Sequence, residues 1–209
     1  MISLPAGSAK SRLYFLRGLM NCPKLFVASL LLASSFFASN LAAQEKPQEK
    51  SAPAAPPAAP AANSKDVETI DAIMAAIYNV ISGPAGERDW NRFRSLFVSE
   101  ARMGAVRKKP DGSFTASSFT AEGYVERAGS YFKDHAFFES ELSRKTEEFG
   151  HEAHVFSTYE SRNAPGEKPF ARGINSLQLF NDGKRWYIVS IFWDEERPET
   201  PLPEKYLKK

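Results

Sequence analysis

This chain has little of what covalent or metal chemistry needs, with one cysteine and three histidines among 209 residues. A single cysteine excludes an intramolecular disulfide framework and any zinc site with several cysteine ligands. A charge surplus is also missing, because 27 lysines and arginines face 25 aspartates and glutamates. Near-neutrality argues against a dedicated nucleic-acid binder, which normally carries a basic stripe. Serine-nucleophile motifs, phosphate-binding glycine loops and cofactor fingerprints are absent too, so no cofactor is predicted.

Residues 1–43 have the pattern of a secretory signal peptide. They contain four basic residues and no acid, then the apolar run LFVASLLLASSFFA at 25–38, then small residues up to Ala43. Spanning a bilayer takes about 20 apolar residues, so this run favours a cleaved signal over the alternative, an uncleaved anchor. We expect cleavage after Ala43 or Ala42. Met20 is the expected true start, because it gives a more compact signal.

Cleavage changes the character of the mature chain. Removing four basic residues leaves 23 against 25 acids, a formal charge of −2, and it also removes Cys22. A thiol-free exported protein needs no oxidant to fold. The sequence therefore predicts a periplasmic or secreted protein with no stable membrane insertion after processing.

A linker precedes one folded domain. Residues 44–64 are mostly alanine, proline and polar residues, with no aromatic or β-branched residue, which predicts a disordered spacer. Residues 65–209 are then one domain of ordinary size. Its tail, from about residue 195, is expected to lie extended on the domain surface, with Tyr206 or Leu207 packed against the domain.

Hydrophobic periodicity predicts helices first and strands afterwards. An apolar stripe from Val67 to Ile81 indicates a helix capped by Ser64, a short helix follows Asp89, and Thr120 caps a third helix ending near Lys133. A strand is expected between the second and third helices, and four more follow the third. The expected strands are 101–108, 137–147, 152–161, 170–180 and 185–193. Helices segregated from an antiparallel sheet make the fold class α+β.

The last expected strand is apolar on both faces. Trp186, Ile188 and Phe192 alternate with Tyr187, Val189, Ile191 and Trp193. Helices can cover only one face of the sheet, whereas an antiparallel sheet in a monomer usually exposes the other face to water. We therefore expect a homodimer in which a second copy covers the other face.

Two motifs resemble SnoaL-like domains of the nuclear transport factor 2-like superfamily. The stretch ERDWNRFRSLF at 87–97 resembles their second helix, and NDGKRWYIVS at 181–190 is similar to their closing hairpin. The resemblance covers essentially residues 65–209. It implies a cystatin-like α+β barrel, in which a curved antiparallel sheet and three helices form a cone with a pocket and subunits often pair through the sheet. Members include isomerases, dehydratases, cyclases and binding modules without chemistry.

Several residues are candidates for a site in such a cone. His154 could act as a general acid or base, oriented by Glu160 or Glu139, if its face of the strand lines the cone. Arg172 could hold a carboxylate or enolate, although a surface ion pair is the alternative. Asp89 is interpreted as a helix cap and not as a base. The residues expected to line the pocket are Tyr78, Tyr124, Phe138, Tyr159 and Trp193.

No metal site is predicted, because His151 and His154 are three residues apart on a strand and therefore point to opposite faces. The leading interpretation is a non-catalytic domain that binds a small apolar or amphipathic molecule in the cone. One alternative is a cofactor-independent isomerase, dehydratase or cyclase acting beside a carbonyl, with His154 as base and Arg172 stabilising negative charge. Another is a protein-interaction module whose own side chains fill the cone.

Overall fold

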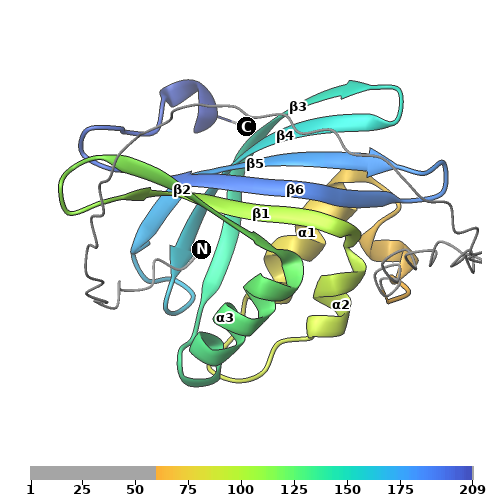
Figure 1. Cartoon of the computed structure of the whole chain (residues 1–209), viewed down its shortest axis with the longest axis horizontal. Helices are drawn as coiled ribbons and strands as arrows, with labels where there is room; N and C mark the ends of the chain where they lie inside the picture. The colour runs from red at the N-terminus through yellow and green to blue at the C-terminus, as the bar shows by residue number, and fades with distance from the viewer. Residues whose placement is uncertain (1–59, 209) are drawn as a thin grey trace, which may run out of the picture. The chain divides into compact units, whose positions relative to one another are not determined.

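Three helices lie against one face of a six-stranded sheet in the computed structural model, which describes residues 60–208 (Figure 1). The predicted signal peptide and nearly all of the predicted linker lie outside these residues. Within 60–208, no helix is long and apolar enough to cross a membrane. The helices are α1 (Ile70–Ile81), α2 (Trp90–Ser95) and α3 (Ala121–Asp134), with short 3-10 turns η1 (Ser64–Asp66) and η2 (Glu204–Tyr206). The strands are β1 (Phe97–Lys108), β2 (Phe114–Thr120), β3 (Phe138–Phe149), β4 (Glu152–Arg162), β5 (Ala171–Asn181) and β6 (Trp186–Glu195).

The sheet has the strand order β2-β1-β6-β5-β4-β3. The predicted α+β class is confirmed, but the sheet is mixed because β1 and β6 run parallel while every other pair is antiparallel. Strand β2 was not predicted. Along this serine-containing strand only Phe119 is buried, so it lacks the apolar alternation that identifies a half-buried strand.

The first helix begins later than the sequence predicts. Thr69, and not Ser64, is the N-cap of α1, since its side chain accepts a 3.0 Å hydrogen bond from the amide of Ala72. Ser64 instead opens η1, which Asn63 caps. The other two predicted caps are confirmed, because Asp89 accepts from the amide of Arg92 and Thr120 accepts from the amide of Gly123.

A β-bulge in β6 changes which side chains face the helices. The pairing with β5 shifts between Leu179, opposite Ile188, and Gln178, opposite Ser190, so Val189 is the extra residue. Trp186, Ile188, Ile191 and Trp193 are all buried, whereas Val189 and Phe192 are exposed. The predicted alternation is therefore wrong beyond Val189. The inner face, which packs on the helices, takes the four buried residues, and the outer face keeps Tyr187, Val189 and Phe192.

The C-terminal residues 196–207 cross the outer face, on the side of the sheet away from the helices (Figure 1). We call this segment the strap. The ring of Tyr206 packs edge-on against Phe156 of β4 with centroids 5.0 Å apart. This confirms the prediction that Tyr206 or Leu207 packs against the domain, and it identifies Tyr206.

The pairing of Asp66 with Arg92 ties η1 to α2 and predicts acid sensitivity. Arg92 donates from Nε and Nη2 to both Asp66 oxygens at 2.8 and 2.9 Å, which lowers the pKa of this carboxyl. A lowered folded-state pKa contributes stability above the unfolded value, about 3.9, that is lost as pH falls through the folded value. We expect Asp66→Asn to flatten the pH dependence of the urea midpoint below about pH 4. An unchanged slope in that variant would contradict the assignment.

Candidate functional site

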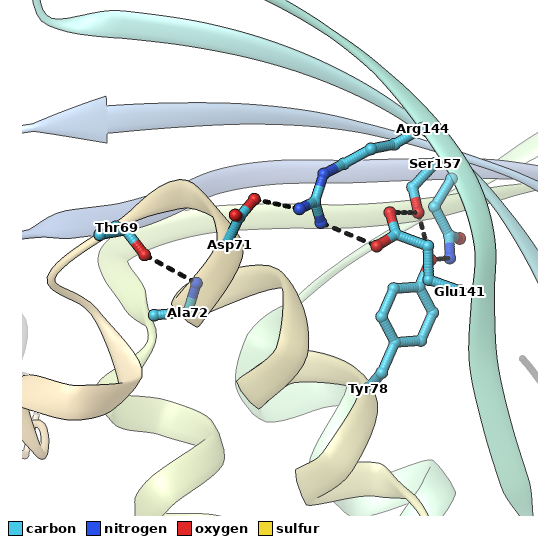
Figure 2. Close-up of polar contacts among 8 residues, drawn as sticks. Thr69, Asp71, Ala72, Tyr78, Glu141, Arg144 and Ser157 are labelled. Atoms are coloured by element: carbon cyan, nitrogen blue, oxygen red, sulfur yellow. Dashed lines mark hydrogen bonds and ion pairs between the residues drawn. The ribbon is translucent and has the colours of Figure 1, made fainter. Parts of the chain in front are cut away.

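A chain of polar side chains runs from the edge of α1 into the space between the helices and the inner face of the sheet, here called the cone interior (Figure 2). Arg144 of β3 pairs with Asp71 of α1 and donates to Glu141 at 2.7 Å. The other oxygen of Glu141 accepts from Ser157 of β4 at 2.6 Å. Ser157 lies 2.7 Å from the hydroxyl of Tyr78, which accepts from Asn175 Nδ2 at 3.1 Å.

The two hydroxyl protons in this set of contacts, those of Ser157 and Tyr78, are donated to protein acceptors. A serine hydroxyl has one proton, and that of Ser157 is donated to Glu141. In the contact with Tyr78, Ser157 must therefore accept, so Tyr78 is the donor. Burial raises the pKa of the Tyr78 hydroxyl, which keeps it protonated. Tyr78 consequently has no second proton with which to polarise a substrate carbonyl. The contacts instead hold α1 against β3, β4 and β5.

The cavity that this chain borders is very small. It is lined by residues that include Tyr78, Glu139, Asn175 and Leu177, and its volume is about 10 Å³. That volume is at the lower limit for one water molecule. Small-molecule pockets are typically ~300–1,000 Å³. This cavity does not match the ligand-sized pocket predicted for the cone, because apolar side chains of α1 and the sheet, such as Met74, Ile77 and Leu177, border it closely.

The residues predicted to line the pocket occupy different positions. Tyr78 borders the small cavity, while Tyr124, Tyr159 and Trp193 are buried. Burial raises the pKa of the Tyr124 and Tyr159 hydroxyls, and neither has a hydrogen-bond partner within residues 60–208. Phe138 alternates with buried Glu139 and pairs with Arg162 on the outer face, so it lies away from the cone interior.

The three predicted catalytic candidates lie on the outer face. The inner side chains of β4 are Ala153, Val155, Ser157, Tyr159 and Ser161, which leaves His154 and Glu160 on the opposite side. His154 Nε2 lies 3.1 Å from Ser176 Oγ, and Glu160 pairs with Arg162. Arg172 pairs with Glu196 of the strap at 2.7 Å. The condition that the His154 face lines the cone is thus not met, and Glu139 cannot orient His154 because it lies on the inner face.

The outer face carries exposed aromatic and apolar side chains at the end of the sheet away from the strap. Phe149 at the tip of the β3–β4 hairpin is 82% exposed, Phe180 of β5 is 41% exposed, and Val189 is 38% exposed. Tyr187 stacks on Phe180 with ring centroids 6.1 Å apart. We call Phe149, Phe180, Tyr187 and Val189 the hairpin-end patch.

The structure also shows where His151, considered above as half of a metal-binding pair, lies. His151 lies in the turn between β3 and β4, with Nδ1 2.9 Å from the carbonyl oxygen of Asn181. Within residues 60–208, no group of three or more histidine, cysteine, aspartate or glutamate residues is arranged to hold a metal ion. Sequence reasoning predicted that the tail lies extended on the domain surface, but not that its residues line a groove over the outer face.

Among known proteins, several solved structures are similar to this chain. No protein-family model matches the chain, and no curated protein sequence matches it. A protein of unknown function with a cystatin-like fold from Nostoc punctiforme is 14% identical, with 64% of this chain and 92% of that chain covered and a TM-score of 0.47. A protein of the NTF2-like family from Streptomyces avermitilis, proposed to be a dehydratase, is 13% identical over 62% and 94% of the two chains, with a TM-score of 0.46. A protein proposed to be a ketosteroid isomerase, from Parabacteroides distasonis, is 13% identical over 63% and 92%, with a TM-score of 0.44.

The solved structures found similar to this chain include proteins described as having an NTF2-like or a cystatin-like fold. At these identities the likeness concerns the fold and carries no activity with it.

Proposed function

We propose that this protein is an exported, non-catalytic binding domain that acts as a homodimer joined through the outer face of its sheet. The observation that carries the proposal is the contrast between the two faces. The cone interior has a cavity of about 10 Å³ beside committed hydrogen bonds, whereas the hairpin-end patch exposes large apolar side chains to solvent. Large exposed apolar patches are typical of interaction sites in soluble proteins.

The arrangement of charges on the outer face favours a second copy of this chain as the partner that covers it. One row of residues crosses the sheet from Glu147 on β3 through His154, Gln178 and Ser190 to Arg102 on β1. The row begins with a carboxylate and ends with a guanidinium. A second copy turned about an axis parallel to the strands brings each Arg102 over the partner's Glu147, so the interface is self-complementary.

The oligomeric state tests the proposal. Light scattering of the purified protein at micromolar concentration should give twice the mass of one chain. Phe180→Glu should give a monomer, because it places a charge in the centre of the contact. Phe114→Glu is the matched control: Phe114 is 50% exposed but lies at the far end of β2, so this variant should remain dimeric. A monomeric wild-type protein at tens of micromolar would refute the dimer.

A charge exchange tests the geometry. Arg102→Glu and Glu147→Arg should each weaken the dimer, because like charges then oppose one another across the interface. The double variant should restore dimerisation to about the wild-type level. Additive weakening in the double variant would mean that these residues do not face each other.

Export is tested separately by N-terminal mass analysis of the mature protein, which should begin at Gln44 or Ala43.

A further inference from the structure

The two edge strands of the sheet differ in how they are protected against pairing with a further strand. Strand β3 contains four glutamates, one arginine and one lysine, and its pairing with β4 shifts register between Glu141 and Ser143. Charged side chains and bulges are devices by which natural edge strands avoid new partners. Strand β2, at the opposite edge, has the sequence FTASSFT, which contains no charged residue and no proline. It pairs with β1 without any register shift, so in the described part of the chain β2 is an edge without these devices.

The pairing with β1 shows which backbone groups of β2 point away from the sheet. At the turn before β2, the amide of Lys109 donates to the carbonyl oxygen of Ser113 at 2.8 Å. Opposite residues in an antiparallel ladder alternate between hydrogen-bonded and non-hydrogen-bonded pairs, and the same register continues along β2. The residues of β2 that bond to β1 are therefore Thr115, Ser117 and Phe119. The residues whose amides and carbonyls point outward are Phe114, Ala116 and Ser118.

Two further observations agree with this assignment. A Cβ added to Gly104 of β1 would lie 2.5 Å from the carbonyl oxygen of Ser117, so this carbonyl points toward β1. Ala116 and Ser118, whose backbone groups point the other way, are both exposed to solvent. The edge of β2 therefore presents a row of backbone donors and acceptors that another strand can use.

A second copy of β2 has the backbone pattern that this edge requires. We consider two β2 strands that run antiparallel about a two-fold axis at Ser117, the central residue of the strand. In this register Ala116 of each copy lies opposite Ser118 of the other, so outward-pointing groups meet outward-pointing groups. The contact is the same seen from either copy, as a two-fold interface requires.

The side chains of β2 also suit pairing with a second copy. The register centred on Ser117 places Thr115 opposite Phe119 and Phe114 opposite Thr120. Pairs of an aromatic with a β-branched residue are favourable across neighbouring strands, whereas like charges directly opposite one another are unfavourable. No like charges oppose one another within this pairing, because β2 carries none.

We propose that the β2 edge is a self-association surface, through which two copies of this chain join their sheets into one continuous sheet. A strand of seven residues is about 24 Å long, so the contact is smaller than the ~1,200 Å² at which stable interfaces begin. The pairing is therefore weak, and it forms well above the micromolar concentrations at which the outer-face dimer is measured. It uses the edge of the sheet and not the outer face, so it goes beyond the proposed homodimer and does not rest on it.

Sedimentation of the full chain carrying Phe180→Glu separates this contact from the outer-face dimer. Between about 10 μM and about 1 mM, the range of weak interfaces, the mass should rise from one chain toward two. A single-chain mass throughout that range would overturn the proposal.

Variants at Ala116 then locate the contact. Ala116→Pro in the same background removes an outward amide that each pairing uses twice, so association should weaken by at least about tenfold. Proline is tolerated in an edge strand where its nitrogen faces solvent. Ala116→Thr is the matched control: it keeps the amide and favours a strand, so it should associate at least as tightly as its parent. Equal association of the proline and threonine variants would overturn the edge assignment, whatever the outcome of the outer-face experiments.

Amide hydrogen exchange gives a second readout that does not depend on how well Ala116→Pro folds. The amides of Thr115 and Ser117 should be protected at every concentration of the Phe180→Glu protein. Those of Ala116 and Ser118 should exchange rapidly in dilute protein and become protected as the mass rises. Protection of Ala116 and Ser118 that does not change with concentration would overturn the proposal, because another segment of the same chain would then cover the edge.

Discussion

Replacement of Arg88 by methionine is expected to lower the free energy of unfolding by about 3–5 kcal/mol. The Arg88 side chain is buried in the loop between α1 and α2, where its guanidinium donates to four carbonyl oxygens. Those acceptors belong to Ile81, Gly83, Pro84 and Gly86, at 2.8–3.0 Å. Methionine keeps much of the apolar stem but removes the donor to the carbonyls of Ile81, Pro84 and Gly86, whereas that of Gly83 keeps the amide of Phe137. Buried unpaired acceptors are costly.

Urea unfolding at neutral pH measures this loss, and Arg94→Met is the matched control. Arg94 makes a two-pronged ion pair with Glu122 on the surface, where both side chains are substantially exposed. Surface pairs contribute at most about 1 kcal/mol, so the control should be far milder. Equal losses in the two variants would show that the loop carbonyls find other donors when Arg88 is absent.

The second large effect is expected from Gly173→Ala, which should destabilise the domain by about 3 kcal/mol. A Cβ at this position of β5 would lie 2.3 Å from the carbonyl oxygen of Asp194 and 2.7 Å from the hydroxyl of Tyr159. Real Cβ atoms do not approach backbone this closely, so the pairing of β5 with β6 must open. Glycine here allows the ring of Tyr159 to lie against the backbone.

The control is Gly129→Ala on α3, where a Cβ would make ordinary contacts with Trp90 at 3.6 Å and beyond. Alanine is favoured over glycine inside a helix by about 0.5–1 kcal/mol, so this variant should be more stable than the wild type. Thermal unfolding of the two variants should therefore show a lower midpoint temperature for Gly173→Ala and a higher one for Gly129→Ala than for the wild type. Destabilisation by Gly129→Ala would indicate crowding at α3 that the contacts do not predict.

The helices could be predicted from the sequence because their signals are local. The apolar stripe of α1 repeats every three to four residues, and Asp89 and Thr120 each cap a helix through an amide three residues away. The start of α1 was misplaced because Ser64 and Thr69 both have side chains that can cap. Ser64 lies in η1, which a contact distant in the sequence holds in place: Arg92, 26 residues beyond Asp66, donates to that aspartate.

The faces of the strands could not all be predicted, because alternation along a strand does not say which side meets the helices. In β3, the carboxylates of Glu139 and Glu141 face the cone interior, where Ser157 and Ser161 donate to them. Phe138 therefore faces outward, against the usual expectation for an aromatic residue. In β6, one extra residue at Val189 reverses the alternation, and a bulge of this kind leaves no clear mark in the sequence.

The sequence by itself determined the order of the three helices and of five of the six strands, the α+β class and the presence of more apolar surface than three helices can cover. These features follow from periodicity, capping and turn residues. Tertiary structure alone decided the parallel pairing of β1 with β6, the side of the sheet on which His154 and Arg172 lie, and the closure of the cone interior. Those features depend on contacts between residues far apart in the chain, such as Tyr78 with Asn175 and Ser143 with Tyr206. A pairing of that kind becomes definite only when packing selects one register among the many that the local pattern permits.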